Sequence, residues 1–564
     1  MAERMTEVER ALNRDAAAEL GKTHMRRGEW PKALGYLEHA IELGAGWDIK
    51  ALFVQCLARL QFTAAAPTLK PLLVRAMRET WAPPADLSRI CAPILMLEPH
   101  MREALASFDG SERSAPLAAA AVRLAMDDAL LWAMLDCAIV ADPAVERLLT
   151  GLRHALLTTR DGGEVVRRFA AKLACQCFAN EYAYVESDRE CGAVETLCHT
   201  LADALHKGEE VDESTLAIAA CYRPLSMLGC DDLLLGRAWP SELNAVVTCQ
   251  LRAPAAERVI ADGIERLTPI REGVSKAVEA QYSENPFPRW IAPPQRATKG
   301  DLQAWLGRTV PAALLLPTRH PREILVTGCG TGQETVGLSL MFADVDILAV
   351  DLSRTSLAYA ARKTGELGLT NVRYAQGDLL NLGNIGRQFD LVVSAGVLHH
   401  LADPAEGLAI LTKLARPGGC LMLALYSELG RRALKEARDF ATEGGYGTSA
   451  MELRRYRKDV LALPAAPWRS ALLAREDFYS LSMLRDLVFH VQEHRFTMTG
   501  LKELVGAQGL CFLGFAAQGG LYQAFARRFG RTADPANLDL WTSFEQENPD
   551  AFGQMYHFLA QKPA

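Results

Sequence analysis

Apolar residues recur at helical spacing through much of the first half of the chain. Residues 129–140, 145–157 and 165–178 carry them every three or four positions, the spacing that places side chains on one face of a helix. Residues 76–270 contain few glycine loops and no constellation of catalytic residue types. This part of the chain is therefore predicted to be all-helical.

The pattern changes near residue 323. Residues 324–326 form a short apolar run, three glycines alternate over 328–332, and a helical pattern then runs to residue 340. A second apolar run, 347–350, ends on Asp351. This order predicts a strand, a tight glycine loop, a helix and a second strand, which is the first half of a nucleotide-binding fold.

Further apolar runs follow Asp351, with turns and helical stretches between them. Parallel strands joined by right-handed crossovers end at one edge of a sheet, so the loops that follow them should share one crevice. The predicted fold class is α/β, a Rossmann-like domain with a seven-stranded sheet, preceded by a large all-α region. Its later strands are predicted at 372–378, 389–394, 420–426, 510–515 and from 555 onward.

The glycine spacing decides which nucleotide the loop suits. Gly328, Gly330 and Gly332 let the backbone pass close to a ligand, but a dinucleotide loop has its third glycine at the position of Gln333. The loop therefore lacks a pyrophosphate-binding site, which disfavours a nicotinamide oxidoreductase. Asp351, at the tip of the second strand, can accept hydrogen bonds from both hydroxyls of a ribose.

Composition narrows the partners and the compartment. Of 564 residues, 49% are hydrophobic and 23% charged, as in folded soluble proteins. A net charge of −7 disfavours a general nucleic-acid binder. The N-terminus lacks the apolar stretch of a signal peptide, and charges interrupt residues 115–140, so no membrane span is expected. The 13 scattered cysteines favour a reduced, cytoplasmic protein, and Cys175 and Cys177 would point apart on a helix rather than share a metal.

Residues 323–426 resemble the class I S-adenosylmethionine (SAM) methyltransferases. The resemblance rests on the phrases Val-Thr-Gly-Cys-Gly-Thr-Gly, Ala-Val-Asp and Val-Leu-His-His-Leu and on the order of the strands. It implies that SAM is the cofactor, that Asp351 takes the ribose hydroxyls and that Asp378 accepts from the adenine amino group. The full set of expected cofactor contacts is Gly328, Cys329, Gly330, Gly332, Gln333, Asp351, Leu352, Asp378, Leu379, Ser394 and, from an earlier segment, Asn285.

Residues 281–296 precede this domain and combine three aromatic residues, four prolines and two arginines. A simple linker would be polar and small. Many SAM enzymes place a segment from before the first strand over the cofactor as a lid, so the resemblance implies that Tyr282 and Asn285 face the cofactor. The alternative is an aromatic clasp that packs the helical region onto the methyltransferase domain.

His399 and His400 follow the fourth strand, where a base would reach the transferred methyl group. A base adds on the order of 10²–10⁴-fold when the nucleophile carries a proton. Consecutive helical residues diverge by about 100°, so only one of the two is expected to face the pocket, His400 in preference to His399. The alternative is a helix start with one histidine packed and the other solvated.

No metal is expected at the two polar clusters of this region. The loop of the paired histidines lacks the carboxylates with which ubiquinone-pathway O-methyltransferases hold a metal. His490, Glu493 and His494 form an inverted zinc-protease pattern at helical spacing, but a helix that grips substrate or simply packs is the favoured interpretation. The basic residues of 431–438 predict a solvated helical face.

The whole chain resembles bacterial fusions of a helical region similar to tetratricopeptide (TPR) repeats with a SAM methyltransferase domain. Residues 20–40 place small and apolar residues, Gly21 and Gly28 among them, at TPR positions. The predicted parts are a TPR-like region at 1–75, an all-helical domain at 76–270, a linker or lid at 271–318 and a methyltransferase domain at 319–564 with helical insertions at about 427–497 and 519–553.

Three functions remain open at this point. The preferred one is a SAM-dependent methyltransferase acting on a protein or peptide side chain that the helical region docks. The second is a small-molecule methyltransferase of secondary metabolism, in which the helical region makes a homodimer. The third is a SAM-binding scaffold, which the intact glycine loop, Asp351 and Asp378 disfavour.

Overall fold

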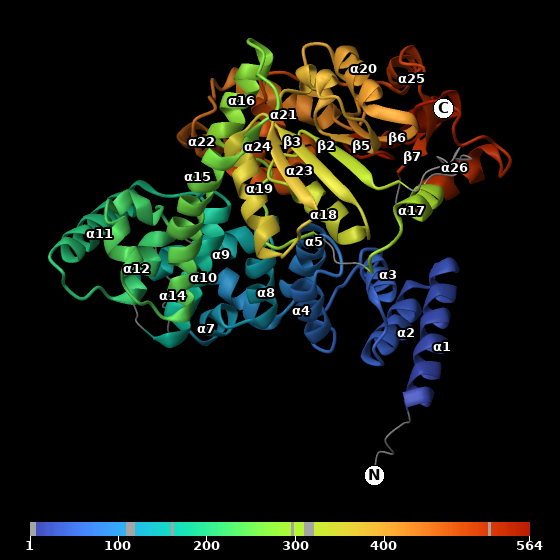
Figure 1. Ribbon diagram of the computed structural model, residues 1–564. Helices are drawn as coiled ribbons and strands as arrows, with labels where there is room; N and C mark the ends of the chain where they lie inside the picture. The colour runs from blue at the N-terminus through green and yellow to red at the C-terminus, as the bar shows by residue number, and fades with distance from the viewer. Residues whose placement is uncertain (1–6, 109–118, 160–162, 295–297, 310–320, 517–519) are drawn as a thin grey trace. The chain divides into compact units, whose positions relative to one another are not determined.

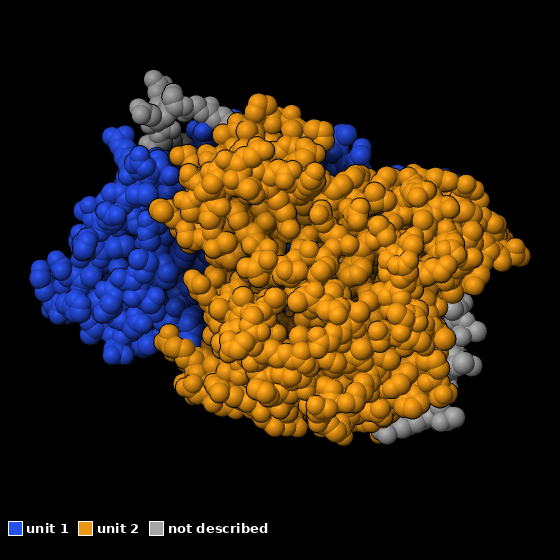
Figure 2. Space-filling view, turned by 90° about the horizontal axis from the view of Figure 1, so that it is seen from above, with its two compact units in different colours: residues 1–254, 290–298, 473–481 blue, residues 255–289, 299–472, 482–564 orange. Residues whose placement is uncertain are grey.

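The chain folds into two compact units, which Figure 2 colours separately. The helical unit comprises Met1–Pro254, Trp290–Thr298 and Leu473–Leu481. The sheet unit comprises Ala255–Arg289, Lys299–Leu472 and Ser482–Ala564. The computed structural model describes residues 7–108, 119–159, 163–294, 298–309, 321–516 and 520–564.

Helices alone build the described part of the helical unit, which confirms the all-α prediction (Figure 1). One large core of Leu, Ala, Val and aromatic side chains joins them. The helices are α1 (Glu7–Arg26), α2 (Trp30–Glu42), α3 (Trp47–Leu57), α4 (Lys70–Glu79), α5 (Pro84–Leu95), α6 (Pro99–Ala106), α7 (Ala120–Met126), α8 (Ala129–Cys137), α9 (Pro143–Thr159), α10 (Glu164–Ala179), α11 (Asp188–His206), α12 (Glu213–Ala220), η1 (Leu225–Leu228), α13 (Asp231–Leu235), α14 (Ser241–Val247), η2 (Thr248–Arg252) and η5 (Glu476–Tyr479).

Helices α1 and α2 approach closely where the sequence has small residues. A Cβ atom at Gly21 would lie 2.7 Å from Cδ2 of Leu37, and Ala33 and Leu37 are fully buried. Small residues allow two helix backbones to touch, as the TPR pattern requires. Membership of that repeat family stays a prediction.

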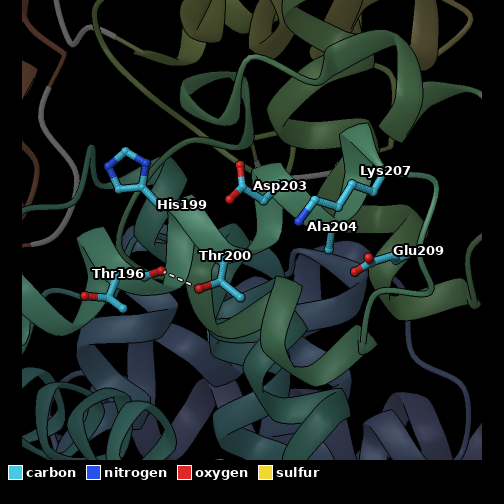
Figure 3. A pocket seen from close by; sticks show the side chains of 7 residues that line it. All are labelled: Thr196, His199, Thr200, Asp203, Ala204, Lys207 and Glu209. Atoms are coloured by element: carbon cyan, nitrogen blue, oxygen red, sulfur yellow. Dashed lines mark hydrogen bonds between the residues drawn. The ribbon is translucent and has the colours of Figure 1, made fainter.

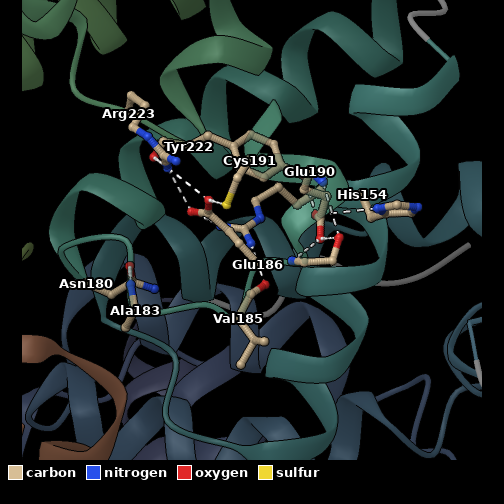
Figure 4. Close-up of polar contacts among 11 residues, drawn as sticks. His154, Asn180, Ala183, Val185, Glu186, Glu190, Cys191, Tyr222 and Arg223 are labelled. Atoms are coloured by element: carbon tan, nitrogen blue, oxygen red, sulfur yellow. Dashed lines mark hydrogen bonds and ion pairs between the residues drawn. The ribbon is translucent and has the colours of Figure 1, made fainter. Parts of the chain in front are cut away.

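A buried arginine organises the middle of the helical unit. Arg153 on α9 donates a hydrogen bond to the carbonyl oxygen of Val185 (2.8 Å), and its guanidinium lies 4.2 Å from the ring centroid of Tyr222. The hydroxyl of Tyr222 donates to Glu190 on α11 (2.9 Å), as Figure 4 shows. A charge taken out of water must be compensated, so this network fixes the arrangement of the helices that supply it.

The sheet unit contains an eight-stranded sheet with the order β1-β4-β3-β2-β5-β6-β8-β7. Strand β8 pairs antiparallel with both β6 and β7, and the other neighbours are parallel. The seven predicted strands form, and a two-residue edge strand adds an eighth. The strands are β1 (Glu265–Arg266), β2 (Glu323–Thr327), β3 (Asp346–Asp351), β4 (Val372–Gln376), β5 (Phe389–Ala395), β6 (Ala415–Tyr426), β7 (Cys511–Phe515) and β8 (Met555–Gln561).

Both faces of this sheet are buried. Successive strand residues point to opposite faces, so Leu325 enters one core while Ile324 and Val326 enter the other. The first core is closed by α20 (Pro404–Leu414), α25 (Met498–Ala507) and α27 (Leu538–Glu547). The second is closed by α17 (Leu302–Thr309), α18 (Gln333–Met341) and α19 (Arg354–Glu366). Burial on two sides explains why the central strands are continuous apolar runs.

The remaining helices cover the sheet or lie in the two long connections near its C-terminal strands. Helices α21 to α24 follow β6, and α26 and α27 lie between β7 and β8. The helices of the sheet unit are α15 (Ala253–Gly263), α16 (Val274–Glu284), α17 (Leu302–Thr309), α18 (Gln333–Met341), α19 (Arg354–Glu366), η3 (Leu379–Asn384), η4 (Leu398–His400), α20 (Pro404–Leu414), α21 (Arg432–Glu443), α22 (Ala450–Ala462), α23 (Pro467–Leu473), α24 (Leu481–Phe489), α25 (Met498–Ala507), α26 (Leu521–Phe529) and α27 (Leu538–Glu547).

Among the described residues, none of the helices has the length and apolar character that crossing a bilayer requires. All 13 cysteines carry free thiols, and only Cys511 is exposed.

Candidate functional site

The glycine loop after β2 adopts a conformation that only glycine accepts easily. Gly328 and Gly330 have φ angles of 61° and 51°, in the left-handed region that costs other residues roughly 1–2 kcal/mol. Space is also limited, because a Cβ at Gly330 would lie 2.3 Å from the carbonyl oxygen of Phe287. Both the torsion and the packing therefore require glycine here.

Asp351 at the end of β3 is tied to this loop. Its carboxylate accepts hydrogen bonds from the backbone N–H groups of Gly330 and Ser353, both at 2.8 Å. The residue is 9% exposed, and burial raises the pKa of its carboxyl group despite these bonds. The sequence-predicted loop and acid therefore meet at the carboxyl ends of β2 and β3.

The last turn of α16 and the segment that follows it lie across the glycine loop. The backbone N–H of Thr331 donates to the carbonyl oxygen of Phe287 (3.1 Å), and the hydroxyl of Thr331 donates to that of Pro288. The hydroxyl of Ser353 donates to the carbonyl oxygen of Tyr282 (2.9 Å). Residues 282–288 are thus anchored to the loops after both β2 and β3, and their role as a cofactor lid stays a prediction.

Asp378 is buried at the N-terminus of η3 and already has donors. Its carboxylate accepts from the backbone N–H groups of Arg271 (2.9 Å) and Leu380 (3.0 Å), and it is 1% exposed. The backbone N–H of Asp378 donates to the hydroxyl of Thr268 (2.8 Å). The chain's own segment 268–271 therefore covers this acid, and its role toward adenine stays a prediction.

The other expected cofactor contacts occupy the same edge of the sheet. Cys329 and Leu379 are buried, and Ser394 is buried on β5 with a hydroxyl that finds no hydrogen-bond partner among the described residues. Gln333 is the first residue of α18, Leu352 follows β3, and Asn285 ends α16 with its amide 3.4 Å from the carbonyl oxygen of Gln281.

Both histidines after β5 are buried, which excludes the alternative in which one of them is solvated. His399 is 0% and His400 7% exposed. The ring of His399 stacks on Tyr426 with centroids 3.6 Å apart, and that of His400 stacks on His490 at the same distance. Burial lowers the pKa of both imidazoles well below the usual value, so they are neutral at neutral pH.

The segment 490–496 is not helical, which corrects the helical spacing assumed for His490, Glu493 and His494. Helix α24 ends at Phe489. The backbone N–H of His494 instead donates to the carbonyl oxygen of His399 (2.7 Å). The three residues of the inverted zinc-protease pattern therefore do not share a helical face.

The basic run 431–438 also differs from the solvated face that was predicted. Arg431 is 1% exposed, donates to the carboxylate of Glu493 (2.9 Å) and lies 3.6 Å from the ring centroid of Tyr426. Arg438 donates to the same carboxylate. Glu493 thus neutralises two guanidinium groups beside the paired histidines.

Sequence reasoning missed Asp486 and Tyr426. Asp486 on α24 is 5% exposed and accepts the hydroxyl of Tyr282 (2.5 Å), and Tyr426 at the end of β6 forms the platform beneath His399. Nothing in the sequence near Asp486 signals its partner. The phrase Leu-Tyr-Ser at the end of the fifth predicted strand was the available signal for Tyr426.

The helical unit has a shallow surface hollow along α11 and the turn after it (Figure 3). Six of its seven lining residues are exposed, and the hydroxyl of Thr200 is engaged with the carbonyl oxygen of Thr196 (2.9 Å). It has none of the buried polar groups that mark the sheet unit's site. The lining residues are Thr196, His199, Thr200, Asp203, Ala204, Lys207 and Glu209.

Three features define a class I methyltransferase domain. They are the strand order β4-β3-β2-β5-β6-β8-β7, the glycine loop after β2, and Asp351 at the end of β3. Residues 325–421 match the family of methyltransferase domains. The chain therefore contains a class I SAM-dependent methyltransferase domain, a family that uses S-adenosyl-L-methionine as its cofactor, and a large helical region precedes it.

Individual relatives cover only parts of the chain. It is 30% identical to an uncharacterised protein of Synechococcus sp. over 43% of this chain and 61% of the relative. It is 36% identical to a trans-aconitate 2-methyltransferase of Deinococcus radiodurans over 23% of this chain and 50% of that enzyme. The chain thus spans about half to three-fifths of the length of these relatives.

Among solved structures, PKMT2 from Rickettsia typhi in complex with AdoHcy is similar, with 17% identity and a TM-score of 0.36 over 46% of this chain and 52% of that chain.

Proposed function

We propose that this protein is a SAM-dependent methyltransferase. The observation that carries the proposal is the bond between Gly330 and Asp351, which joins the glycine loop to the acid at the carboxyl ends of two parallel strands. In such open sheets, ligands bind at that edge. Methyl transfer breaks the bond between sulfur and the methyl carbon, leaves the electron pair on sulfur and forms a bond from the acceptor to the methyl group.

The residues around this edge have separate roles in the proposal. Asp351 accepts from the ribose hydroxyls with the lone pairs that its two backbone donors leave free. The backbone of the glycine loop would face the methionine end, and the segment with Tyr282 and Asn285 would cover the cofactor. Holding the acceptor in line with the methyl group supplies several kcal/mol through positioning alone.

The acceptor end of the site lies near His399, His400 and Tyr426, all of which are buried. A dry site strengthens electrostatic interactions and excludes water as a competing acceptor. His400 is the preferred general base, because its neutral form has a ring nitrogen free to take a proton. Tyr282, whose hydroxyl donates to Asp486, would position the acceptor or the sulfonium.

For the acceptor we propose a protein or peptide side chain that the helical unit docks. Support comes from the size of that unit, from its exposed hollow along α11 and from the ability of helical repeats to bind extended chains. Homodimer formation through the helical region is the alternative use of the same surface. A second candidate is a small-molecule acceptor, which the similarity to a trans-aconitate 2-methyltransferase favours.

The test uses purified protein, radiolabelled SAM and an extract of the cells from which the protein comes, resolved by size. Label in a discrete protein band supports the protein acceptor, and excision of that band identifies it. Label only in small molecules supports the metabolite acceptor. If SAM binds but no label is transferred, the result favours a SAM-binding scaffold. The Asp351→Ala variant is the control, because any label that it still transfers does not depend on this site.

A further inference from the structure

Two imidazoles and one carboxylate converge behind Tyr282. His400 from η4, Asp486 from α24 and His490 just after α24 each offer a ligand atom, and these atoms lie within 4.8 Å of one another. All three residues are less than 9% exposed. Two histidines and a carboxylate, with a further position left open, form a usual donor set for zinc in catalytic sites.

The ring of His400 is already oriented as a metal ligand. Its Nδ1 lies 2.7 Å from the carbonyl oxygen of Gln492, and because a carbonyl only accepts, Nδ1 carries the proton. The lone pair of Nε2 is therefore available. Metal-binding histidines typically donate their second ring nitrogen to a carbonyl or carboxylate in this way.

His490 supplies the second, independent observation. Its Nε2 is buried and has no hydrogen-bond partner among the described residues, while its Nδ1 accepts from the backbone N–H of Gln492 (3.1 Å). A buried polar atom without a partner costs roughly 1–3 kcal/mol. A metal on Nε2 removes that cost, although the ring proton must then move to Nδ1 and the bond to Gln492 is lost.

Asp486 completes the set, and Glu493 does not belong to it. Oδ1 of Asp486 accepts the hydroxyl of Tyr282, so Oδ2 remains for a metal. Glu493 is bound by Arg431 and Arg438. The zinc-like pattern read along the sequence therefore names only one residue of the spatial cluster, His490.

We propose that His400, Asp486 and His490 bind a divalent transition metal of the zinc class. Zinc ligands about 2.0–2.2 Å from the metal lie roughly 3.4 Å from one another in a tetrahedron. Closing the cluster therefore needs side-chain shifts of about 1 Å and a rotation of the His400 and His490 rings, which stack with an interplanar angle of 25°. The lone pair of His400 that binds the metal is the one a general base would use. The metal site and the base role of His400 are therefore alternatives.

The experiment uses the full chain, stripped of metal with a chelator and titrated with Zn²⁺ by calorimetry and with Co²⁺ by absorption. We expect one equivalent to bind with a visible cobalt band and without the ultraviolet thiolate band that any of the 13 cysteines would give. Asp486→Asn and His490→Gln should each weaken this binding at least tenfold. His494→Asn, in the same segment but outside the cluster, should leave it unchanged.

Circular dichroism of each variant separates lost binding from lost folding, and Asp486→Asn preserves both the size of the side chain and an acceptor for Tyr282. The proposal is overturned if the wild type binds no metal beyond thiolate sites, or if a folded Asp486→Asn variant keeps the same stoichiometry and affinity. Binding is measured without SAM or acceptor, so its failure leaves the proposed methyl transfer standing.

Discussion

The hydroxyl of Tyr282 donates a hydrogen bond to the carboxylate of Asp486, which lies 204 residues further along the chain. The backbone carbonyl of the same tyrosine accepts from Ser353, directly after the second strand of the glycine-loop unit. One residue thus joins the segment over the loop, the end of β3 and the helix α24. The ring itself lies 6.1 Å from the rings of Phe287 and His490, so the ring and the hydroxyl can be tested separately.

Replacing Tyr282 should lower turnover while the fold stays intact. Tyr282→Ala removes the ring that we propose covers the cofactor, and we expect kcat to fall at least tenfold. Tyr282→Phe keeps the ring and removes only the bond to Asp486, so we expect a smaller loss of a few-fold. Steady-state kinetics with SAM measures both. Normal kinetics in Tyr282→Ala would return residues 282–288 to a purely packing role.

Gly330→Ala should loosen the segment over the glycine loop. The new methyl group would meet the carbonyl oxygen of Phe287 at 2.3 Å, and the φ of 51° is unfavourable for alanine, so a cost of roughly 1–3 kcal/mol is expected. The midpoint temperature of thermal unfolding and the affinity for SAM should both decrease. Limited proteolysis would show cleavage near residue 287 in the variant.

The matched control is Gly506→Ala, within α25, where an added Cβ meets nothing within 4 Å. A helical Gly→Ala change with free space stabilises by about 0.5–1 kcal/mol. Equal effects of the two substitutions would contradict the close approach at Gly330.

The helical unit should lose stability in acid through Glu79. Burial alone raises the pKa of its carboxyl group, but hydrogen bonds from Lys50, Arg75 and Trp81 outweigh burial and lower the pKa to about 2. The folded pKa is below the unfolded value, so this stabilisation is present above about pH 4.5 and is lost as the pH falls toward 2. Because solvent screens a side chain that is 34% exposed, we expect Glu79 to contribute about 1–2 kcal/mol to the free energy of unfolding.

Glu79→Gln should therefore lower the denaturant midpoint at pH 7 and flatten its decline between pH 5 and 2.5. Glu103→Gln changes the charge equally at an exposed position of α6 and should leave both unchanged. If the denaturant midpoint fell equally steeply between pH 5 and 2.5 in Glu79→Gln and in wild type, Glu79 would not be the source of the acid sensitivity.

Local patterns were sufficient to predict the sheet and the glycine loop. Runs such as 347–350 are bounded by turn residues and end on an acid, so strand, loop and ligand-facing residue can be assigned within about thirty residues of sequence. The helical unit was predictable as a class for the same reason. Asp378 illustrates the limit, because the segment that covers it lies more than 100 residues earlier.

Contacts between distant segments could not be predicted from the sequence. The basic run at 431–438 looks like a solvated face, yet Arg431 is buried because Glu493, 62 residues later, neutralises it. Similarly, Asp486 lies in an apolar helix without any motif, and only the fold brings it to Tyr282 and His490. The end of α24 at Phe489 then removed the helical geometry on which the sequence interpretation of His490 to His494 depended.

The most direct test of the account is calorimetric titration of the purified chain with SAM. Wild type should bind one equivalent, and Asp351→Ala should bind at least tenfold more weakly, because the variant loses both the proposed ribose acceptor and the bond that holds Gly330. Asp346→Ala, exposed at the opposite end of β3, should bind as wild type does. Absence of SAM binding by wild type, or unchanged affinity in a folded Asp351→Ala variant, would contradict the proposed cofactor site.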